Sequence, residues 1–175
     1  MTTSHKSNKG FSLIELLLVV AIIGIISAIA VPNLISSKRS ANEASALATV
    51  RVILSAEATY QATSGAGLYG DLAALRNQNL VDQGVGAATI AGVGTAKNGY
   101  LFSAANIAGT GGAAFDAKSQ PAVHTSVSTL FATGSRSFFV NEGGVMYFNT
   151  TGTAPTCAAT SARTVTAGAG GGILN

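Results

Sequence analysis

The chain has 175 residues, a formal net charge of +3, 21 glycines and a single cysteine. Its length favours one domain. Two of the 10 basic residues, Lys6 and Lys9, lie in the first ten positions. The rest of the chain has 8 basic and 7 acidic residues. That near-neutral balance gives no nucleic-acid-binding footprint, and the lone Cys157 excludes an intramolecular disulfide.

Residues 1–10 are polar and basic, and residues 11–35 are apolar apart from one charge, Glu15. As a helix, the apolar stretch would rise about 37 Å at 1.5 Å per residue, against roughly 30 Å of bilayer hydrocarbon. A helix that is apolar on every side belongs in a membrane or a large core, and this chain is too small for such a core. The sequence therefore predicts a membrane-spanning helix.

Three interpretations of this stretch compete: a cleaved secretory signal, a permanent single-span anchor, and a leader removed before the apolar run. Ala28-Ile29-Ala30 fits a signal-peptidase site, and cleavage there would release a domain beginning at Val31. Glu15 argues against this first interpretation. A carboxylate costs about 2.5 to 3.5 kcal/mol at the bilayer centre, and a discarded signal has no use for it.

The segment KGFSLIELL, from Lys9 to Leu17, is followed by the long apolar run and Pro32. It resembles the class III leader of type IV prepilins, over residues 9 to about 35. The resemblance implies cleavage between Gly10 and Phe11 by a membrane prepilin peptidase, which also methylates the new amino group of Phe11. Residues 1–10 would then be a leader peptide, and the helix of residues 11–35 would remain with the mature protein.

The same resemblance implies an assembly role for Glu15, whose carboxylate would pair with the amine of Phe11 on a neighbouring subunit. Two charges in an apolar filament core offset each other's desolvation, so the pairing is physically reasonable. The alternatives are a catalytic acid and a charge exposed at the membrane interface.

Gly24 and Pro32 both weaken the predicted helix, glycine through backbone entropy and proline by removing a donor. We expect a kink or local melting there. In filaments of the resembling family the helix between such residues is commonly extended, whereas the alternative is a simple proline bend in a membrane helix.

Residues 36–64 read as an amphipathic continuation of the helix. Leu47, Val50, Leu54 and Ala58 recur at spacings of three and four, while Arg51 and Glu57 occupy intervening positions. Glycines at 65 and 67 supply a stop signal.

Residues 65–175 are expected to form a globular β-rich head with a flexible glycine-rich tail over 164–175. A helical turn is expected over 71–75, and strands over 100–103, 137–140 and 145–148, the last two joined as a hairpin. A further strand is expected near 114–117 or 129–132. So small a sheet needs a helix to cover it, which predicts an α+β, pilin-like fold: a long N-terminal α-helix packed on a small antiparallel β-sheet.

The residues that commonly carry catalysis are sparse. His124 is the only histidine after the leader, and with Cys157 it makes no metal-ligand spacing. The glycine-rich loops lack the Walker lysine, and no nucleophile elbow appears. We therefore expect no enzymatic activity, no cofactor and no metal.

The resemblance implies the precursor of a structural subunit that polymerises with copies of itself. Implied partners are a prepilin peptidase, an inner-membrane assembly platform with its ATPase, minor pilins, and the membrane before assembly; nucleic acid is not expected. The precursor would lie in a bacterial inner membrane, and the product in an extracellular pilus or a periplasmic pseudopilus. The alternatives are a type II secretion pseudopilin and a secreted or single-span anchored binding domain.

Overall fold

The computed structural model describes residues 10–90, 95–107, 113–125, 128, 130–157, 164–168 and 170–174. The chain divides into two compact units, Met1–Ser37 and Lys38–Asn175. The long helix α1 (Leu13–Ala62) contributes residues to both units.

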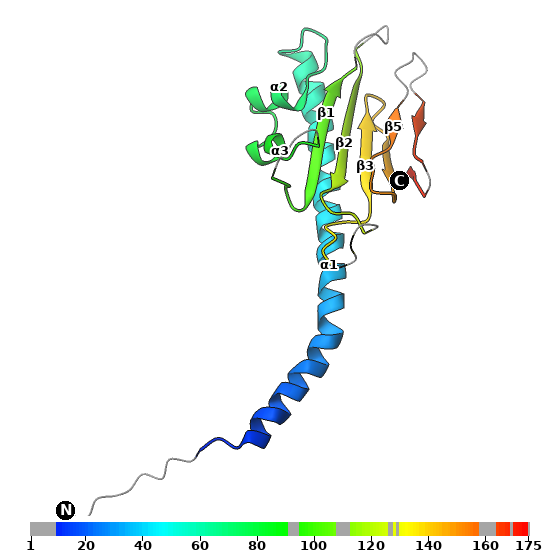
Figure 1. Cartoon of the computed structure of the whole chain (residues 1–175). Helices are drawn as coiled ribbons and strands as arrows, with labels where there is room; N and C mark the ends of the chain where they lie inside the picture. The colour runs from blue at the N-terminus through cyan, green and yellow to red at the C-terminus, as the bar shows by residue number, and fades with distance from the viewer. Residues whose placement is uncertain are drawn as a thin grey trace, which may run out of the picture. The chain divides into compact units, whose positions relative to one another are not determined.

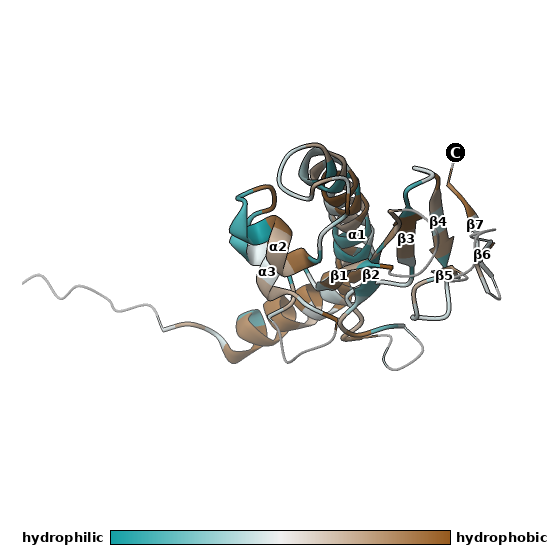
Figure 2. Cartoon of the chain, turned by 90° about the horizontal axis from the view of Figure 1, so that it is seen from above, coloured by the Kyte–Doolittle hydropathy of each residue, from teal (hydrophilic) through white to brown (hydrophobic). Residues whose placement is uncertain are grey.

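In the first unit, α1 has the length and apolar composition needed to cross a membrane, and its most apolar stretch is entirely unburied. In Figure 2 the part of α1 that follows the grey N-terminal trace is drawn mostly in brown, which marks hydrophobic residues. Gly24 and Pro32 both lie inside the helix, which is continuous through them. Of the expected kink or local melting, melting is therefore not seen in the isolated chain, because one proline removes a single backbone donor while the turns on either side remain bonded. The kink stays a prediction.

In the second unit, α1 buries one face made mainly of small side chains: Ala46, Thr49, Val50, Ile53, Ala56 and Glu57. The apolar positions predicted from the sequence, Leu47, Val50, Leu54 and Ala58, only partly coincide with this buried face. Val50 lies at its centre, Leu47 and Leu54 are only partly buried, and Ala58 is exposed. Small side chains in the middle allow the helix to approach the sheet closely, so the leucines pack at its margins.

An antiparallel five-stranded sheet has the order β1-β2-β3-β4-β7 (Figure 2). Its strands are β1 (Tyr100–Asn106), β2 (Phe115–Pro121), β3 (Ser137–Asn141), β4 (Met146–Asn149) and β7 (Gly172–Ile173). The predicted hairpin is confirmed as β3 and β4, with Val140 opposite Met146. Of the two places considered for a further strand, 114–117 overlaps β2, whereas the described residues 130–132 form none.

The C-terminal glycine-rich region makes pairings that its composition did not suggest. Strand β6 (Val165–Thr166) pairs with β5 (Thr156–Cys157), and β7 adds to the main sheet with Ile173 opposite Tyr147. An edge strand presents unpaired N–H and C=O groups, and β7 satisfies part of that edge on β4. The expectation of a flexible tail over residues 164–175 therefore left out the pairing of β6 and β7.

Two short helices, α2 (Leu72–Asn77) and α3 (Gln83–Ala87), lie beside β1 in both Figure 1 and Figure 2. Each begins at an aspartate that accepts a hydrogen bond from a backbone N–H three residues on. The Asp71–Ala74 bond is 2.7 Å and the Asp82–Val85 bond is 2.8 Å. The expected turn at 71–75 overlaps α2, whereas α3 was not predicted.

The core of the second unit lies between α1 and the sheet. Tyr100, Phe102 and Ala104 alternate along β1 and point inward, where they join Val50 and Ile53. Burying a large side chain of this kind stabilises the fold by about 1.5 to 3 kcal/mol.

Two hydrogen bonds give the direction of β1 along the helix. Near its start, Asn98 Nδ2 donates to Ser45 Oγ at 2.8 Å, and at its end Asn106 Nδ2 donates to the carbonyl of Tyr69, also at 2.8 Å. The beginning of β1 therefore lies near the N-terminal end of the second unit's helix. Its end lies near the segment that follows the helix, where Gly70 bonds back to Glu57.

Candidate functional site

Glu15 caps the start of α1. The backbone N–H groups of Glu15 and Leu16 both donate to the carbonyl of Ser12, at 3.1 and 3.3 Å. In return the Ser12 N–H donates to Glu15 Oε2 at 3.0 Å. This return bond is the acidic half of a capping box, which satisfies a donor that the helix itself leaves unpaired.

Glu15 therefore has a local role in the isolated chain that the sequence reading missed. The signal was present, because Ser12 and Glu15 have the S-x-x-E spacing of a capping box. The carboxylate also adds negative charge at a helix N-terminus, where the helix dipole favours it.

Gly10 and Phe11, the residues of the predicted cleavage site, are both exposed just before α1. The Phe11 side chain is 79 % exposed. A Cβ built on Gly10 would meet no atom within 4 Å. Among the described residues, none therefore requires glycine at this position.

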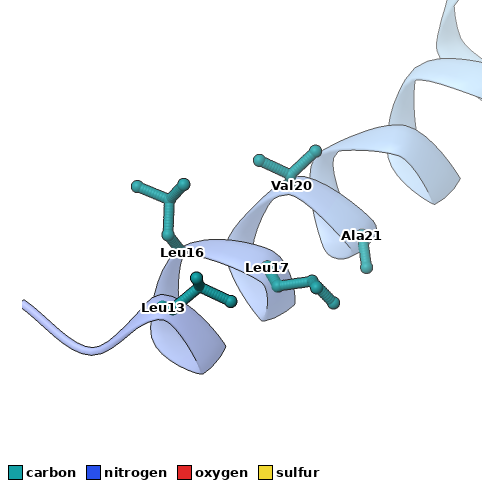
Figure 3. A pocket seen from close by; sticks show the side chains of 5 residues that line it. All are labelled: Leu13, Leu16, Leu17, Val20 and Ala21. Carbon is teal, nitrogen blue, oxygen red and sulfur yellow. The ribbon is translucent and has the colours of Figure 1, made fainter.

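The helix surface that follows is apolar and exposed. A shallow groove near its start is lined by Leu13, Leu16, Leu17, Val20 and Ala21, and Figure 3 shows only carbon atoms in these side chains. The large apolar side chains from Leu13 to Leu34 are between 48 % and 80 % exposed. A continuous exposed surface of this size marks contact with lipid or with another apolar surface.

Gly24 and Pro32 lie on this same helix. A Cβ on Gly24 would also meet nothing within 4 Å, so neither packing nor backbone conformation demands glycine there in the isolated chain. The effect of both residues on helix flexibility stays a prediction for the assembled state.

The second unit brings together no group of three or more potential metal-binding residues, within the part of the chain that the structure describes. His124 is buried with Nε2 3.0 Å from the carbonyl oxygen of Ser135. Cys157 is half-buried, and its Sγ lies 3.8 Å from Asn141 Nδ2.

Glu57 is the buried charge that the sequence reading placed on an intervening position of the helix. It is fully buried, with Oε2 accepting the Gly70 N–H at 2.9 Å and Oε1 without a hydrogen-bond partner among the described residues. Burial raises its pKa to about 7, an effect opposed by the Gly70 hydrogen bond and reinforced by nearby Asp71. No sequence pattern identified it, because its neighbour Gly70 lies 13 residues further along the chain.

The chain is similar to known proteins in its N-terminal region. Residues 5–31 match the family model described as the prokaryotic N-terminal methylation motif. The chain is 39 % identical over 56 residues to the type IV major pilin protein PilA of Myxococcus xanthus, covering 32 % of this chain. It is 50 % identical over 38 residues to PilA4, the type IV wide pilus major component of Thermus thermophilus, covering 22 % of this chain.

These matched stretches span 26 % and 29 % of the two relatives' own lengths. No solved structure matches the chain. The expected resemblance to type IV pilins is confirmed for the N-terminal segment, and the long helix with its antiparallel sheet confirms the expected pilin-like α+β arrangement.

Proposed function

We propose that this chain is the precursor of a filament subunit. The premise is that its N-terminal segment matches the prokaryotic N-terminal methylation motif and resembles type IV pilins. The observation that carries the proposal is the start of α1: a long, unburied apolar helix with a single carboxylate four residues after Phe11. Both relatives are named as major pilus components, and we extend that role to this chain.

The proposed pathway begins with cleavage after Gly10 and methylation of the Phe11 amine by a prepilin peptidase. The helix of the first unit then stays in the membrane until an assembly platform with its ATPase moves the subunit into the filament. Exposed apolar side chains such as Leu16 and Leu17 would exchange lipid for neighbouring helices. Because lipid is as apolar as these side chains, specificity must come from packing and from charge.

Glu15 supplies that charge in the proposal. In the isolated chain its Oε2 accepts the Ser12 N–H, and in the filament it would accept the Phe11 amine of a neighbour. A carboxylate has two oxygens and about four acceptor positions, so it can keep the cap while making the new pair. Each charge then offsets the desolvation of the other.

Gly24 and Pro32 are proposed to let the intervening helix extend during assembly. Glycine costs a helix about 1 kcal/mol relative to alanine and proline about 3 kcal/mol, so this segment is the least costly part of α1 to unwind. New contacts in the filament would have to compensate for the backbone bonds lost.

A type II secretion pseudopilin is the closest alternative, since the segment that carries the likeness is shared. We favour a pilus subunit because both relatives named above are pilus components. Minor pilins as partners, and an inner-membrane precursor with an extracellular product, belong to the same proposal.

The test is the N-terminal residue and mass of the chain recovered from membranes and from sheared filaments. We expect N-methylated Phe11 in both fractions. A Gly10→Leu variant should accumulate with residues 1–10 attached, whereas a Gly24→Ala control should be cleaved normally. A mature chain beginning at Val31 in the soluble fraction would instead indicate a secreted domain and contradict the filament proposal.

A further inference from the structure

The second unit exposes two large apolar side chains on the connection between β2 and β3. Leu130 is 67 % exposed and Phe131 is 79 % exposed, and they are adjacent in sequence. The Phe131 N–H donates to Ser128 Oγ at 3.1 Å, which turns the backbone at this point. Two adjacent exposed apolar residues of this size are more informative than isolated surface leucines, and we call this pair the apolar tip.

Hydrogen bonds place this apolar tip, Leu130 and Phe131, at one end of the second unit. The Asn42 side chain donates to the Thr133 carbonyl at 2.9 Å, and Glu43 Oε1 accepts from the Ser135 N–H at 2.8 Å. Residues 133–135 of the connection therefore lie beside the N-terminal part of the second unit's helix. Phe131 is two residues from Thr133, so its backbone lies within about 7 Å of that contact.

The same end of the unit is basic and is joined to the apolar helix. Lys38 and Arg39 lie one helical turn before Asn42 and Glu43, a rise of about 6 Å. Lys38 follows Ser37, the last residue of the first unit, so this end stays next to the apolar helix in whichever direction that helix points. Arg136, half-exposed, is paired with Glu43, its Nε lying 3.9 Å from Glu43 Oε2, so the net positive charge of this end comes from Lys38 and Arg39.

We infer that Leu130 and Phe131 form a membrane-surface anchor, which inserts into the headgroup region of the bilayer while Lys38 and Arg39 face anionic lipid phosphates. This inference rests on the proposed storage of the first helix in a membrane. Phenylalanine and leucine beside lysine and arginine are the combination that holds peripheral segments about 5 to 10 Å deep in an interface. The anchor would hold the head of a stored subunit against the bilayer, with its β1–β2 end directed outward.

Tryptophan fluorescence tests the inference cleanly, because the natural chain has no tryptophan. Phe131→Trp and Leu68→Trp would each carry the only indole. Leu68 is the matched control: it is 56 % exposed, and it precedes Tyr69, which bonds to the opposite end of β1. Both full-length variants are reconstituted into vesicles of equal parts phosphatidylcholine and phosphatidylglycerol.

The expected result is a blue-shifted emission for Phe131→Trp and severalfold stronger quenching by lipids brominated near the headgroup than for Leu68→Trp. If both variants float with the vesicles and are quenched equally weakly, the anchor is overturned. A blue shift of Phe131→Trp that appears only after filament formation would also overturn it and would assign the tip to a contact with a second copy. Failure of both variants to float would contradict membrane storage of the helix, and the anchor with it.

Discussion

Glu15 and Glu57 are two carboxylates on one helix whose surroundings give them different properties. Glu15 is exposed and closes the helix start through Ser12. Glu57 is enclosed between α1 and the segment leading to α2, with one oxygen bonded to Gly70 and the other unsatisfied among the described residues. A carboxylate buried in this way is costly in its charged form and less so when it is protonated.

The raised pKa of Glu57 predicts a pH-dependent stability of the second unit. Burial raises this pKa from the ordinary 4.5 to about 7. Between these two values the unfolded chain has released the proton while the folded chain retains it. The free energy of unfolding should therefore fall as pH rises through this window, by on the order of 3 kcal/mol at about 1.4 kcal/mol per unit, and change little above it.

Glu57→Gln tests the sign of this effect. Glutamine cannot ionise and keeps an oxygen for the Gly70 N–H, so the variant should be more stable than the natural chain at pH 8 and lose this pH dependence. Urea denaturation in mild detergent, followed by tyrosine fluorescence, measures both quantities. Glu15→Gln is the control, because it removes a carboxylate from the same helix outside the second unit. Parallel pH profiles for Glu57→Gln and the natural chain would contradict the assignment.

At the scale of elements, the connection from β2 to β3 is fitted tightly against β1 at Gly134. A Cβ at this position would lie well inside van der Waals distance of the Tyr100 hydroxyl. Tyr100 has little freedom to move, since its ring is fully buried and its hydroxyl donates to the Arg136 carbonyl at 2.7 Å. Glycine at 134 is thus required by close approach.

Gly134→Ala should destabilise the second unit by about 1 to 3 kcal/mol, the usual cost of overpacking. Tyr100→Phe removes the nearest clashing atom, so the double variant should lose less stability than the sum of the two single variants. Thermal unfolding of the four proteins gives this coupling energy. Gly24→Ala, which has open space around it, should leave the unfolding of the second unit unchanged. Strict additivity of the two single effects would show that the side chains do not meet.

The elements that were predicted correctly are those with strong local signals. The β3–β4 hairpin combines two aromatic-rich runs with the turn residues Asn141 and Gly144, and Gly144 adopts a φ of +72° that favours glycine. By contrast, β7 is two residues long and glycine-rich, and it forms because β4 offers an unpaired edge. The local sequence around Gly172 contains no information about that edge.

At the scale of the whole molecule, the apolar helix and the β-rich head have separate requirements. The first unit buries none of its apolar stretch within the chain, whereas the second has a complete core. The head can therefore fold while the apolar helix remains available to lipid or, as proposed, to other copies of the chain.

Two substitutions of Glu15 distinguish helix capping from charge pairing in assembly. Glu15→Gln keeps an oxygen for the Ser12 N–H but removes the charge, whereas Glu15→Ala removes both. Leaving the Phe11 amine buried without a partner costs on the order of 3 to 5 kcal/mol, so both variants should yield at least about tenfold fewer filaments. Only the alanine variant should show faster hydrogen exchange at the start of α1. Normal filament yield from Glu15→Gln would mean that capping, not charge, is what assembly requires.

The sequence by itself determined the N-terminal segment: its apolar helix, its lone carboxylate, its predicted cleavage site and its likeness to type IV pilins. These features are contiguous along the chain, so each can be recognised from local sequence. Only the tertiary structure decided the burial of Glu57, the pairing of β7 and the contact of Thr133 with Asn42. Each of these depends on segments 13 to more than 90 residues apart, whose meeting is determined by packing of the whole core and not by any local pattern.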